Sequence, residues 1–208
     1  MISVNPDDLS TSGRYRLLTG IVVPRPIAWV ASQESANSPI NLAPFSCFTF
    51  VCYEPMLVAF VVGRKLGARK DTAVNIAASG QFVLHISDEV LVEEVHLSAI
   101  EHPPHLSEVT HLNLQTTPSD LVDVPRISRA PIALECRLDQ TIEFGDIRSE
   151  MIVGRVVQIH LREDLMKNGK IETADLNPLA RIGGPRYTTI GPVLSMPTIA
   201  ASPAVSDS

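Results

Sequence analysis

Cysteine is scarce in this sequence and never paired. Cys47, Cys52 and Cys136 are odd in number, and none belongs to a Cys-x-x-Cys motif. A disulfide framework and a zinc knuckle both need paired thiols, so the sequence indicates neither. Free thiols suit a reducing compartment, and we expect a cytoplasmic protein.

Long apolar runs are also lacking. No apolar stretch approaches the roughly 18 residues that a membrane-spanning helix needs. The opening residues, Met-Ile-Ser-Val-Asn-Pro-Asp-Asp, carry two acids and no apolar core, which is not the pattern of a secretory signal peptide. We therefore expect no membrane partner.

Positive charge is in short supply. The 17 lysines and arginines are outnumbered by 23 acidic residues, which gives a formal net charge of -6. Affinity for a phosphate backbone comes mostly from Lys and Arg, so this balance argues against nucleic acid as a partner. Any phosphate group that the protein binds must be held by a local cluster of cations.

The sequence has no Gly-x-Gly-x-x-Gly motif after a predicted strand, so a stable Rossmann site for a dinucleotide is not indicated. A nicotinamide cofactor is expected to visit the protein only transiently. What the chain does have is length and apolar content. With 208 residues and 45% apolar residues, it can bury a core as one domain, for which we predict the bounds 1–208.

Short β-type runs dominate the pattern, and one helix is well marked. Lys70-Asp71-Thr72 opens a helix that continues over residues 73–79 and stops at Gly80. We interpret residues 88–125 as an insertion with one or two short helices that covers one end of a barrel, and the Pro/Ser/Ala-rich tail from residue 192 as loose. Strands are predicted over residues 27–32, 40–51, 56–62, 82–87, 131–139 and 150–162.

This pattern predicts a mainly β fold with flanking helices. Many short strands and Gly/Pro turns favour a closed or partly closed antiparallel barrel over a doubly wound sheet.

A basic loop is the most informative local feature. Residues 63–72, Gly-Arg-Lys-Leu-Gly-Ala-Arg-Lys-Asp-Thr, place four cations and two glycines between a strand and the start of a helix. Backbone N–H groups at a helix N-terminus, together with Lys and Arg side chains, suit a phosphate monoester. The alternative is a solvated basic turn in which Asp71 only caps the helix.

Two further segments carry residues that are unusual for their place. Residues 41–46, Asn-Leu-Ala-Pro-Phe-Ser, put polar side chains and a proline into an apolar strand. This is typical either of a bent strand that offers its backbone to a planar ligand or of a barrel corner with a bulge. In residues 179–187 a glycine pair separates Arg181 from Tyr187, which frames either a ligand or a simple chain reversal.

Taken together, these segments resemble the flavin reductase-like, FMN-binding split-barrel family, and the resemblance spans residues 25–187. It rests on order and spacing rather than on one motif. The matching residues are Arg25 to Ser32, Asn41 to Ser46 with Phe48, Arg69-Lys70-Asp71-Thr72 with Asn75, Gly80 to Val83, Pro131 to Cys136, Gly154-Arg155-Val156, and Arg181-Ile182-Gly183-Gly184 with Tyr187.

The resemblance implies an FMN-binding split β-barrel that works as a homodimer, with FMN near the interface between the two subunits. Residues 41–46 should line the flavin ring, with the backbone of Ala43 and Phe45 as hydrogen-bond candidates, and Trp29 either packs under the site or is an ordinary core aromatic. The implied cofactor-binding residues are Ser32, Asn41, Leu42, Ala43, Pro44, Phe45, Ser46, Arg69, Lys70, Asp71, Thr72, Arg181 and Tyr187.

Ser32, Arg69, Lys70 and Thr72 are the implied phosphate and ribityl contacts, and Arg181 and Tyr187 are implied near the flavin or the dimer interface. One departure bears on activity. Many short members of the family carry an Asp-His pair before the glycine of a late strand, whereas residues 148–154 here read Arg-Ser-Glu-Met-Ile-Val-Gly. The chain looks more like the longer branch that keeps FMN as a prosthetic group.

Three functions follow from the resemblance. The first is an NAD(P)H-dependent oxidoreductase that passes electrons from FMN to a small acceptor, free flavin or oxygen. The second is an FMN-dependent oxygenase or bond-cleaving enzyme for a small organic substrate, which the missing Asp-His pair favours. The third is a flavin-binding protein without turnover. The sequence identifies no catalytic residue, because the flavin carries its own reactivity.

The predicted insertion is rich in ligand-type side chains, but their spacing matches no known metal motif. We interpret it as a solvated or lid-like loop and predict no metal site. If it lies over the flavin, one of its histidines is expected to contact substrate or to donate a proton. The residues concerned are Glu93, Glu94, His96, His102, His105 and His111.

Overall fold

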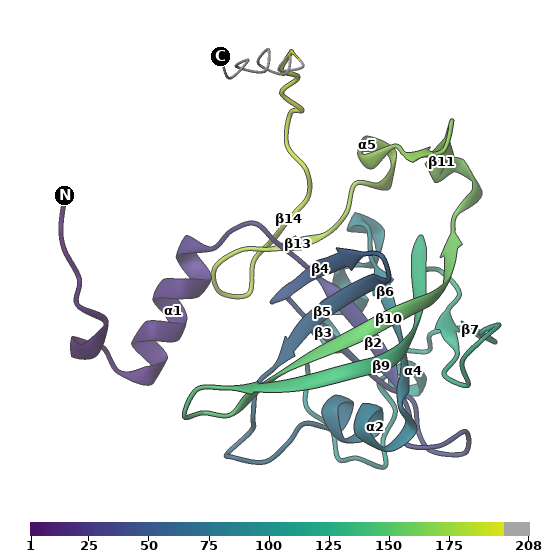
Figure 1. Cartoon of the computed structure of the whole chain (residues 1–208), viewed down its shortest axis with the longest axis horizontal. Coiled ribbons are helices and arrows are strands. Elements are labelled where there is room, and N and C mark those ends of the chain that lie inside the picture. Colours follow the sequence, from purple (N-terminus) through teal and green to yellow (C-terminus); the bar gives the residue numbers. More distant parts are fainter. Residues whose placement is uncertain (198–208) are drawn as a thin grey trace, which may run out of the picture.

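The computed structural model describes residues 1–197. A seven-stranded sheet in the order β3-β2-β6-β9-β10-β5-β4 is antiparallel throughout and curls into a half-barrel (Figure 1). This confirms the predicted mainly β fold. Its strands are β2 (Ala28–Ser32), β3 (Asn41–Phe45), β4 (Phe48–Tyr53), β5 (Met56–Val62), β6 (Gln81–Ile86), β9 (Ile132–Phe144) and β10 (Ser149–Leu161).

Smaller elements surround the half-barrel. The helices are α1 (Thr11–Ile21), α2 (Asp71–Ser79), α3 (Val92–Leu97), α4 (Glu108–His111) and α5 (Thr173–Leu176), with 3-10 turns at Pro6–Asp8, Glu89–Leu91 and Glu163–Leu165. The two-residue strands are β1 (Arg25–Pro26), β7 (Thr116–Thr117), β8 (Arg126–Ile127), β11 (Met166–Lys167), β12 (Lys170–Ile171), β13 (Ala180–Arg181) and β14 (Tyr187–Thr188).

The run predicted as one strand over residues 40–51 is two strands. β3 pairs with β2 at one edge of the sheet, and β4 pairs with β5 at the other. The chain therefore breaks at Ser46 and Cys47 to cross the open side of the barrel. The Val61 N–H donates to the Cys47 carbonyl at 2.9 Å, which extends the β4–β5 pairing by one residue beyond Phe48.

The predicted helix is present, and the residue that ends it can be recognised in the local sequence. α2 stops at Gly80, which adopts the left-handed conformation with φ 70°, as a glycine does without the steric penalty of a Cβ. At its start Lys70 is the N-cap, and its side chain makes no capping hydrogen bond. The alternative in which Asp71 caps the helix is thus not what forms, because Asp71 is the first helical residue.

Apolar side chains pack on both faces of the sheet. α2 covers one face with Ala73 and Ile76, which join a cluster that includes Phe60 and Phe82. Residues from the predicted insertion cover the other face, where Leu91, Val95, Val109, Leu114, Val122 and Val124 pack against Trp29 and Val83. This segment is therefore part of the hydrophobic core and holds its polar side chains in fixed positions beside the sheet.

A buried histidine joins this segment to the sheet. His85 is fully buried, its Nδ1 lies 2.9 Å from the Trp29 carbonyl, and its Nε2 accepts the Ile127 N–H at 2.9 Å. An imidazole that donates with one nitrogen and accepts with the other is neutral. Burial lowers its pKa from 6.5 to about 4, although the hydrogen bond to Trp29 opposes this and Arg126 assists it.

We expect this histidine to make stability depend on pH. Between pH 6.5 and about 4 the unfolded chain binds a proton that folded His85 refuses, so stability is complete above pH 6.5 and falls as the pH drops through that window. The loss from this residue is about 3 kcal/mol. Urea unfolding of the wild type and His85→Gln across this range is the measurement. An equal pH slope in both proteins would contradict it.

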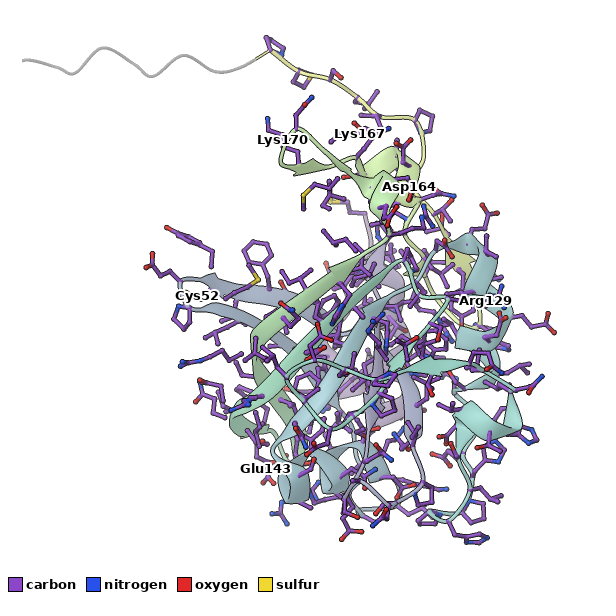
Figure 2. All side chains as sticks on the ribbon, turned by 90° about the vertical axis from the view of Figure 1, so that its right-hand side faces the viewer. Cys52, Arg129, Glu143, Asp164, Lys167 and Lys170 are labelled. Carbon is purple, nitrogen blue, oxygen red and sulfur yellow. The ribbon has the colours of Figure 1, made fainter. Side chains whose placement is uncertain are left out.

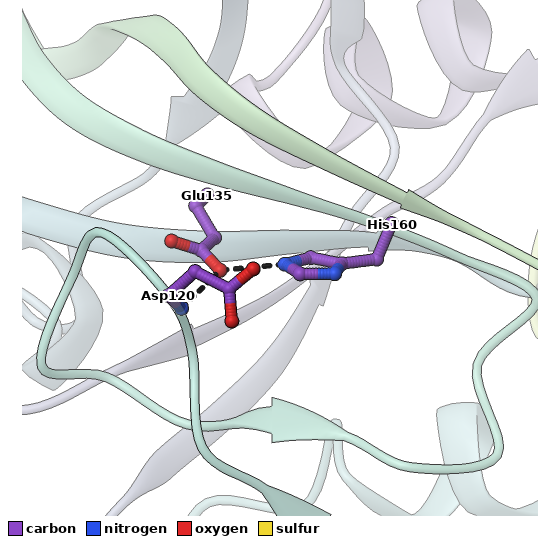
Figure 3. Close-up of side chains that lie close together, drawn as sticks. All are labelled: Asp120, Glu135 and His160. Atoms are coloured by element: carbon purple, nitrogen blue, oxygen red, sulfur yellow. Dashed lines mark hydrogen bonds and ion pairs between the residues drawn. The ribbon is translucent and has the colours of Figure 1, made fainter.

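A buried carboxylate anchors the segment at a second point (Figure 3). Glu135 on β9 has no exposed surface and accepts the N–H groups of Asp120 and Leu121 at 2.7 and 2.6 Å, while His160 Nε2 lies 2.6 Å from its Oε1. Burial alone would raise the pKa of Glu135, but these hydrogen bonds outweigh it and lower the pKa. The Glu135 carboxylate, held by the backbone N–H groups of Asp120 and Leu121 and by the His160 side chain, is thus interpreted as a loop anchor.

The last elements lead away from the barrel. β13 pairs with both β1 and β14, and residues 189–197 form no helix or strand. The rest of the predicted loose tail lies outside the described residues. Within residues 1–197, no helix is both long enough and apolar enough to cross a membrane.

Candidate functional site

A cleft of about 270 Å³ lies between β3, the basic loop and the insertion segment. It gathers eight of the thirteen residues implied as cofactor contacts: Asn41, Ala43, Pro44, Phe45, Arg69, Lys70, Asp71 and Thr72. The opposite wall comes from the insertion segment and adds Ser98, Ala99, Ile100, Glu101, His102, Pro104 and Glu108, while the basic loop adds Lys65 and Ala68.

The edge position of β3 explains its unusual sequence. β3 pairs with β2 residue for residue, without a register shift, so the alternative of a bulged corner is not what forms. Leu42 sends its N–H away from β2 to Glu108 Oε2 at 2.9 Å. Because backbone groups alternate sides along a strand, Pro44 also faces outward. Proline is tolerated there because no ladder hydrogen bond is lost.

The same alternation decides which backbone groups are open to a ligand. The N–H and C=O groups of Ala43 and Phe45 face β2 and belong to the sheet. This differs from the expectation that they meet the flavin ring. The outward groups are the carbonyls of Leu42 and Pro44, which are acceptors, and the Leu42 N–H, which Glu108 already occupies. A planar ligand with an N–H group on its edge is complementary to that set.

The four cations of the basic loop divide into two pairs. Arg64 and Arg69 both contact the buried Glu150 carboxylate of β10, at 3.3 and 2.9 Å, and Arg69 also donates to the Ala73 carbonyl. The arginines therefore tie the loop and α2 to the sheet. Arg69 lines the cleft, but its guanidinium is largely committed to this structural role.

The two lysines lie at the mouth of the cleft, on the other side of the loop. Lys65 Nζ lies 2.5 Å from Glu101 Oε2, and Lys70 Nζ lies 3.9 Å from Glu101 Oε1. Lys65 is placed by a tight turn in which it exchanges two backbone hydrogen bonds with Ala68, and both central residues, Leu66 and Gly67, have positive φ. Such a turn holds the lysine on a short, defined loop.

Polar side chains form the floor of the cleft beside α2. Asn41 Nδ2 donates to Thr72 Oγ1 at 2.7 Å and approaches Ser32 Oγ at 3.4 Å. Ser32 has no exposed surface and supports Asn41 from behind rather than lining the cleft itself. Asn41 and Thr72 are therefore the floor groups that a ligand in the cleft can reach.

Four of the implied residues lie elsewhere in the single chain. Leu42 has no exposed surface and packs in the core, and Ser46 Oγ accepts from Arg25 at 3.3 Å. Arg181 stacks over the Tyr187 ring at 4.6 Å and donates to its hydroxyl at 2.6 Å. His96 Nδ1 lies 3.1 Å from the same hydroxyl, so the Arg181 and Tyr187 hairpin contacts α3 two residues before the cleft wall begins at Ser98.

Several residues of the cleft wall were not predicted as site residues. Glu108 is buried at its base, and its pKa is raised by burial against the opposing hydrogen bond from Leu42. Ser98 accepts the indole N–H of Trp29 at 2.9 Å, so Trp29 is both a core aromatic and a support beneath the site. His102 is the one histidine of the insertion that lines this cleft among the described residues.

Comparison with known proteins agrees with this architecture. The sequence model of the flavin reductase like domain matches residues 20–180. The chain is 40% identical to the uncharacterized protein BH2278 of Halalkalibacterium halodurans over 205 residues, 95% of this chain and 98% of that protein.

Two solved structures are similar over almost the whole chain. Nitrilotriacetate monooxygenase component B from Bacillus cereus has a TM-score of 0.91 at 36% identity and covers 94% of this chain and 98% of its own. The 2-nitrobenzoate 2-nitroreductase NbaA from Pseudomonas fluorescens has a TM-score of 0.87 at 31% identity, with 99% and 100% covered. The chain belongs to the flavin reductase like domain family.

Proposed function

We propose that the chain binds FMN in the cleft between β3 and α2 and acts as an NAD(P)H-dependent oxidoreductase of the flavin reductase kind. Its electrons pass to a small acceptor, free flavin or oxygen. The observation that carries the proposal is the pairing, in one cleft, of a β edge suited to a flavin ring with a cationic mouth suited to a phosphate. The bound flavin would supply the hydride chemistry.

The phosphate end is supported by charge and by the start of α2. Lys65 and Lys70 stand at the mouth of the cleft, where α2 begins without a side-chain cap. Its first N–H groups and the positive end of its dipole favour an anion. Thr72 and Asn41 lie just inside and suit the hydroxyl groups of a ribityl chain. FMN joins these three chemistries in one molecule.

The ring end is supported by the edge of β3. The Pro44 and Leu42 carbonyls can accept a hydrogen bond from the N–H on the ring edge, and the small side chain of Ala43 leaves room beside the strand. The buried Trp29 and Ser98 pair keeps the opposite wall in place. These residues orient the cofactor, which is the contribution that a flavoprotein makes to the reaction.

A second candidate is an FMN-dependent enzyme that acts on a small organic substrate. It is favoured by the insertion segment, which closes the cleft with His102 and the buried Glu108. A similar structure at 31% identity is a 2-nitrobenzoate 2-nitroreductase. Under this reading the two side chains would contact the substrate rather than the flavin.

Anaerobic mixing separates these readings. The protein loaded with FMN is mixed with NADH or NADPH without oxygen, and the flavin absorbance near roughly 450 nm is followed. Rapid bleaching with a nicotinamide supports the reductase. Bleaching too slow for turnover, followed by reaction only when an organic substrate is added, would replace it with the second candidate. If the bound flavin reacts under neither condition, the protein binds flavin without turnover.

We also propose that the protein is a homodimer with FMN near the subunit interface. The cleft of about 270 Å³ is just below the roughly 300–1,000 Å³ usual for ligand pockets, and a second subunit would complete it. α1 buries none of its residues and stands off the barrel (Figure 1). The β4–β5 hairpin near Cys52 also projects from the barrel (Figure 2). Both expose large apolar side chains: Tyr15, Leu17, Leu18, Ile21, Phe50, Val51, Tyr53 and Met56.

A charged variant on α1 tests the dimer. Because α1 packs no side chain into the core, we expect Leu18→Glu with Ile21→Glu to keep the fold and to shift the protein from dimer to monomer in sedimentation analysis. Flavin affinity should fall together with the dimer. A wild-type protein that sediments as a monomer at every concentration would contradict the proposal.

We also propose the reducing cytosol as the compartment of this protein, which its three free thiols fit.

A further inference from the structure

The contact between Glu101 and the two lysines is the feature that the proposed function leaves unexplained. A carboxylate from the insertion segment occupies the cationic mouth of the cleft, with Lys65 at 2.5 Å and Lys70 at 3.9 Å. Of the loop's four cations these are the two free of Glu150. A second anion that binds both ammonium groups therefore competes with the Glu101 carboxylate.

The ion pairs of Glu101 with Lys65 and Lys70 are weak enough for another anion to replace the carboxylate. The side chains of Lys65, Lys70 and Glu101 are all about half exposed, at 52, 42 and 48%, and exposed ion pairs of this kind are weak. The Lys65 ammonium holds the pKa of Glu101 below its ordinary value, so Glu101 carries one full negative charge at neutral pH. A phosphate monoester carries about 1.5 to 2 negative charges and three acceptor oxygens, which makes it the stronger partner for two ammonium groups.

We propose that Glu101 is a built-in competitor at the phosphate end of the cleft: its carboxylate holds the Lys65 and Lys70 ammonium groups and lowers the affinity for FMN until a phosphate monoester displaces it. The proposal rests on the proposed function, since it concerns the same cleft. Flavins without a phosphate would leave Glu101 in place. The phosphate end of the cleft therefore distinguishes ligands by the presence of the phosphate rather than by the ring.

Removing the competing carboxylate is the direct test. Apoprotein is titrated with FMN and with riboflavin, which lacks the phosphate, and binding is followed by quenching of flavin fluorescence. We expect Glu101→Gln to bind FMN about fivefold more tightly than the wild type, and to bind riboflavin unchanged. Lys65→Gln should weaken FMN about tenfold and leave riboflavin unchanged.

Glu94→Gln is the matched control. It removes the same charge from the same segment, but Glu94 pairs with Arg129 at 3.0 Å and does not line the cleft, so its FMN affinity should equal that of the wild type. Unchanged or weaker FMN binding by Glu101→Gln, or an equal gain for riboflavin, would overturn the proposal. A wild type that binds no flavin at all would instead overturn the proposed function.

Discussion

Lys70→Glu should reduce FMN affinity by about a thousandfold. The substitution removes a charge-assisted hydrogen bond to the phosphate and places a carboxylate at the mouth of the cleft, and together these are worth about 4 kcal/mol. It also puts that carboxylate near Glu101, which lies 3.9 Å from the present ammonium. Equilibrium titration with FMN is the measurement, and riboflavin binding should change much less.

Lys170→Glu is the matched control for this charge reversal. Lys170 lies on the β11–β12 hairpin (Figure 2), at the opposite end of the molecule from α2 (Figure 1), and is exposed. It changes net charge by the same amount without touching the cleft. If Lys70→Glu and Lys170→Glu weaken FMN equally, net charge rather than a phosphate contact determines affinity, and the placement of the phosphate is wrong.

Gly154→Val should destabilise the protein by about 4 kcal/mol or more, at the upper end of what overpacking does. A Cβ built at Gly154 would lie 2.3 and 2.8 Å from Phe82 Cζ and Cε1, and 3.3 Å from Cys136 Cβ. The Phe82 ring is fully buried and packs against Phe60 at a centroid distance of 5.6 Å. A Cβ at this position therefore requires this buried ring or β10 to shift.

The control for Gly154 is Gly63→Ala. A Cβ at Gly63 meets nothing within 4 Å, so its unfolding free energy should stay within about 0.5 kcal/mol of the wild type. Urea unfolding of both variants is the measurement. Gly154→Val with near wild-type stability would mean that β10 and Phe82 separate easily, which contradicts the close packing of this face of the sheet.

Features that depend on neighbouring residues were predictable from the sequence. The α2 helix with its Gly80 stop, the Met56–Val62 strand and the cationic loop all arise from short-range chemistry. Eight of the implied contacts meet in the cleft because the loop and β3 lie side by side in this fold. The resemblance to the family also included Gly154, for which the structure supplies the reason in the Phe82 ring.

Features that depend on distant pairing were not predictable. Pro44 is compatible with an edge strand, but nothing local in Asn41–Phe45 gives the register of β3 with β2. That register decides that the backbone groups of Leu42 and Pro44 face outward and those of Ala43 do not. Arg69 and Lys65 are both cations of the basic loop, and the sequence alone does not distinguish their roles. The roles differ because Glu150, about eighty residues away in the sequence, forms an ion pair with Arg69. Lys65 has no contact with Glu150 and lies at the mouth of the cleft.

The positions of Glu101 and Glu108 in the cleft wall could not be predicted from the sequence for the same reason. Its segment has no strong periodicity, and its position follows from burying Leu91, Val95 and Val109 against the sheet. Acidic residues in a loosely patterned stretch are usually solvated. Their role appears only when the segment is packed beside β3.

A crystal structure of the protein with FMN would test the central claim most directly. We expect the flavin ring along the outer edge of β3, against Pro44, and the phosphate within hydrogen-bond distance of Lys65 and Lys70 with Glu101 displaced. Flavin bound elsewhere on the barrel, or no flavin at saturating FMN, would contradict the assignment of the cleft.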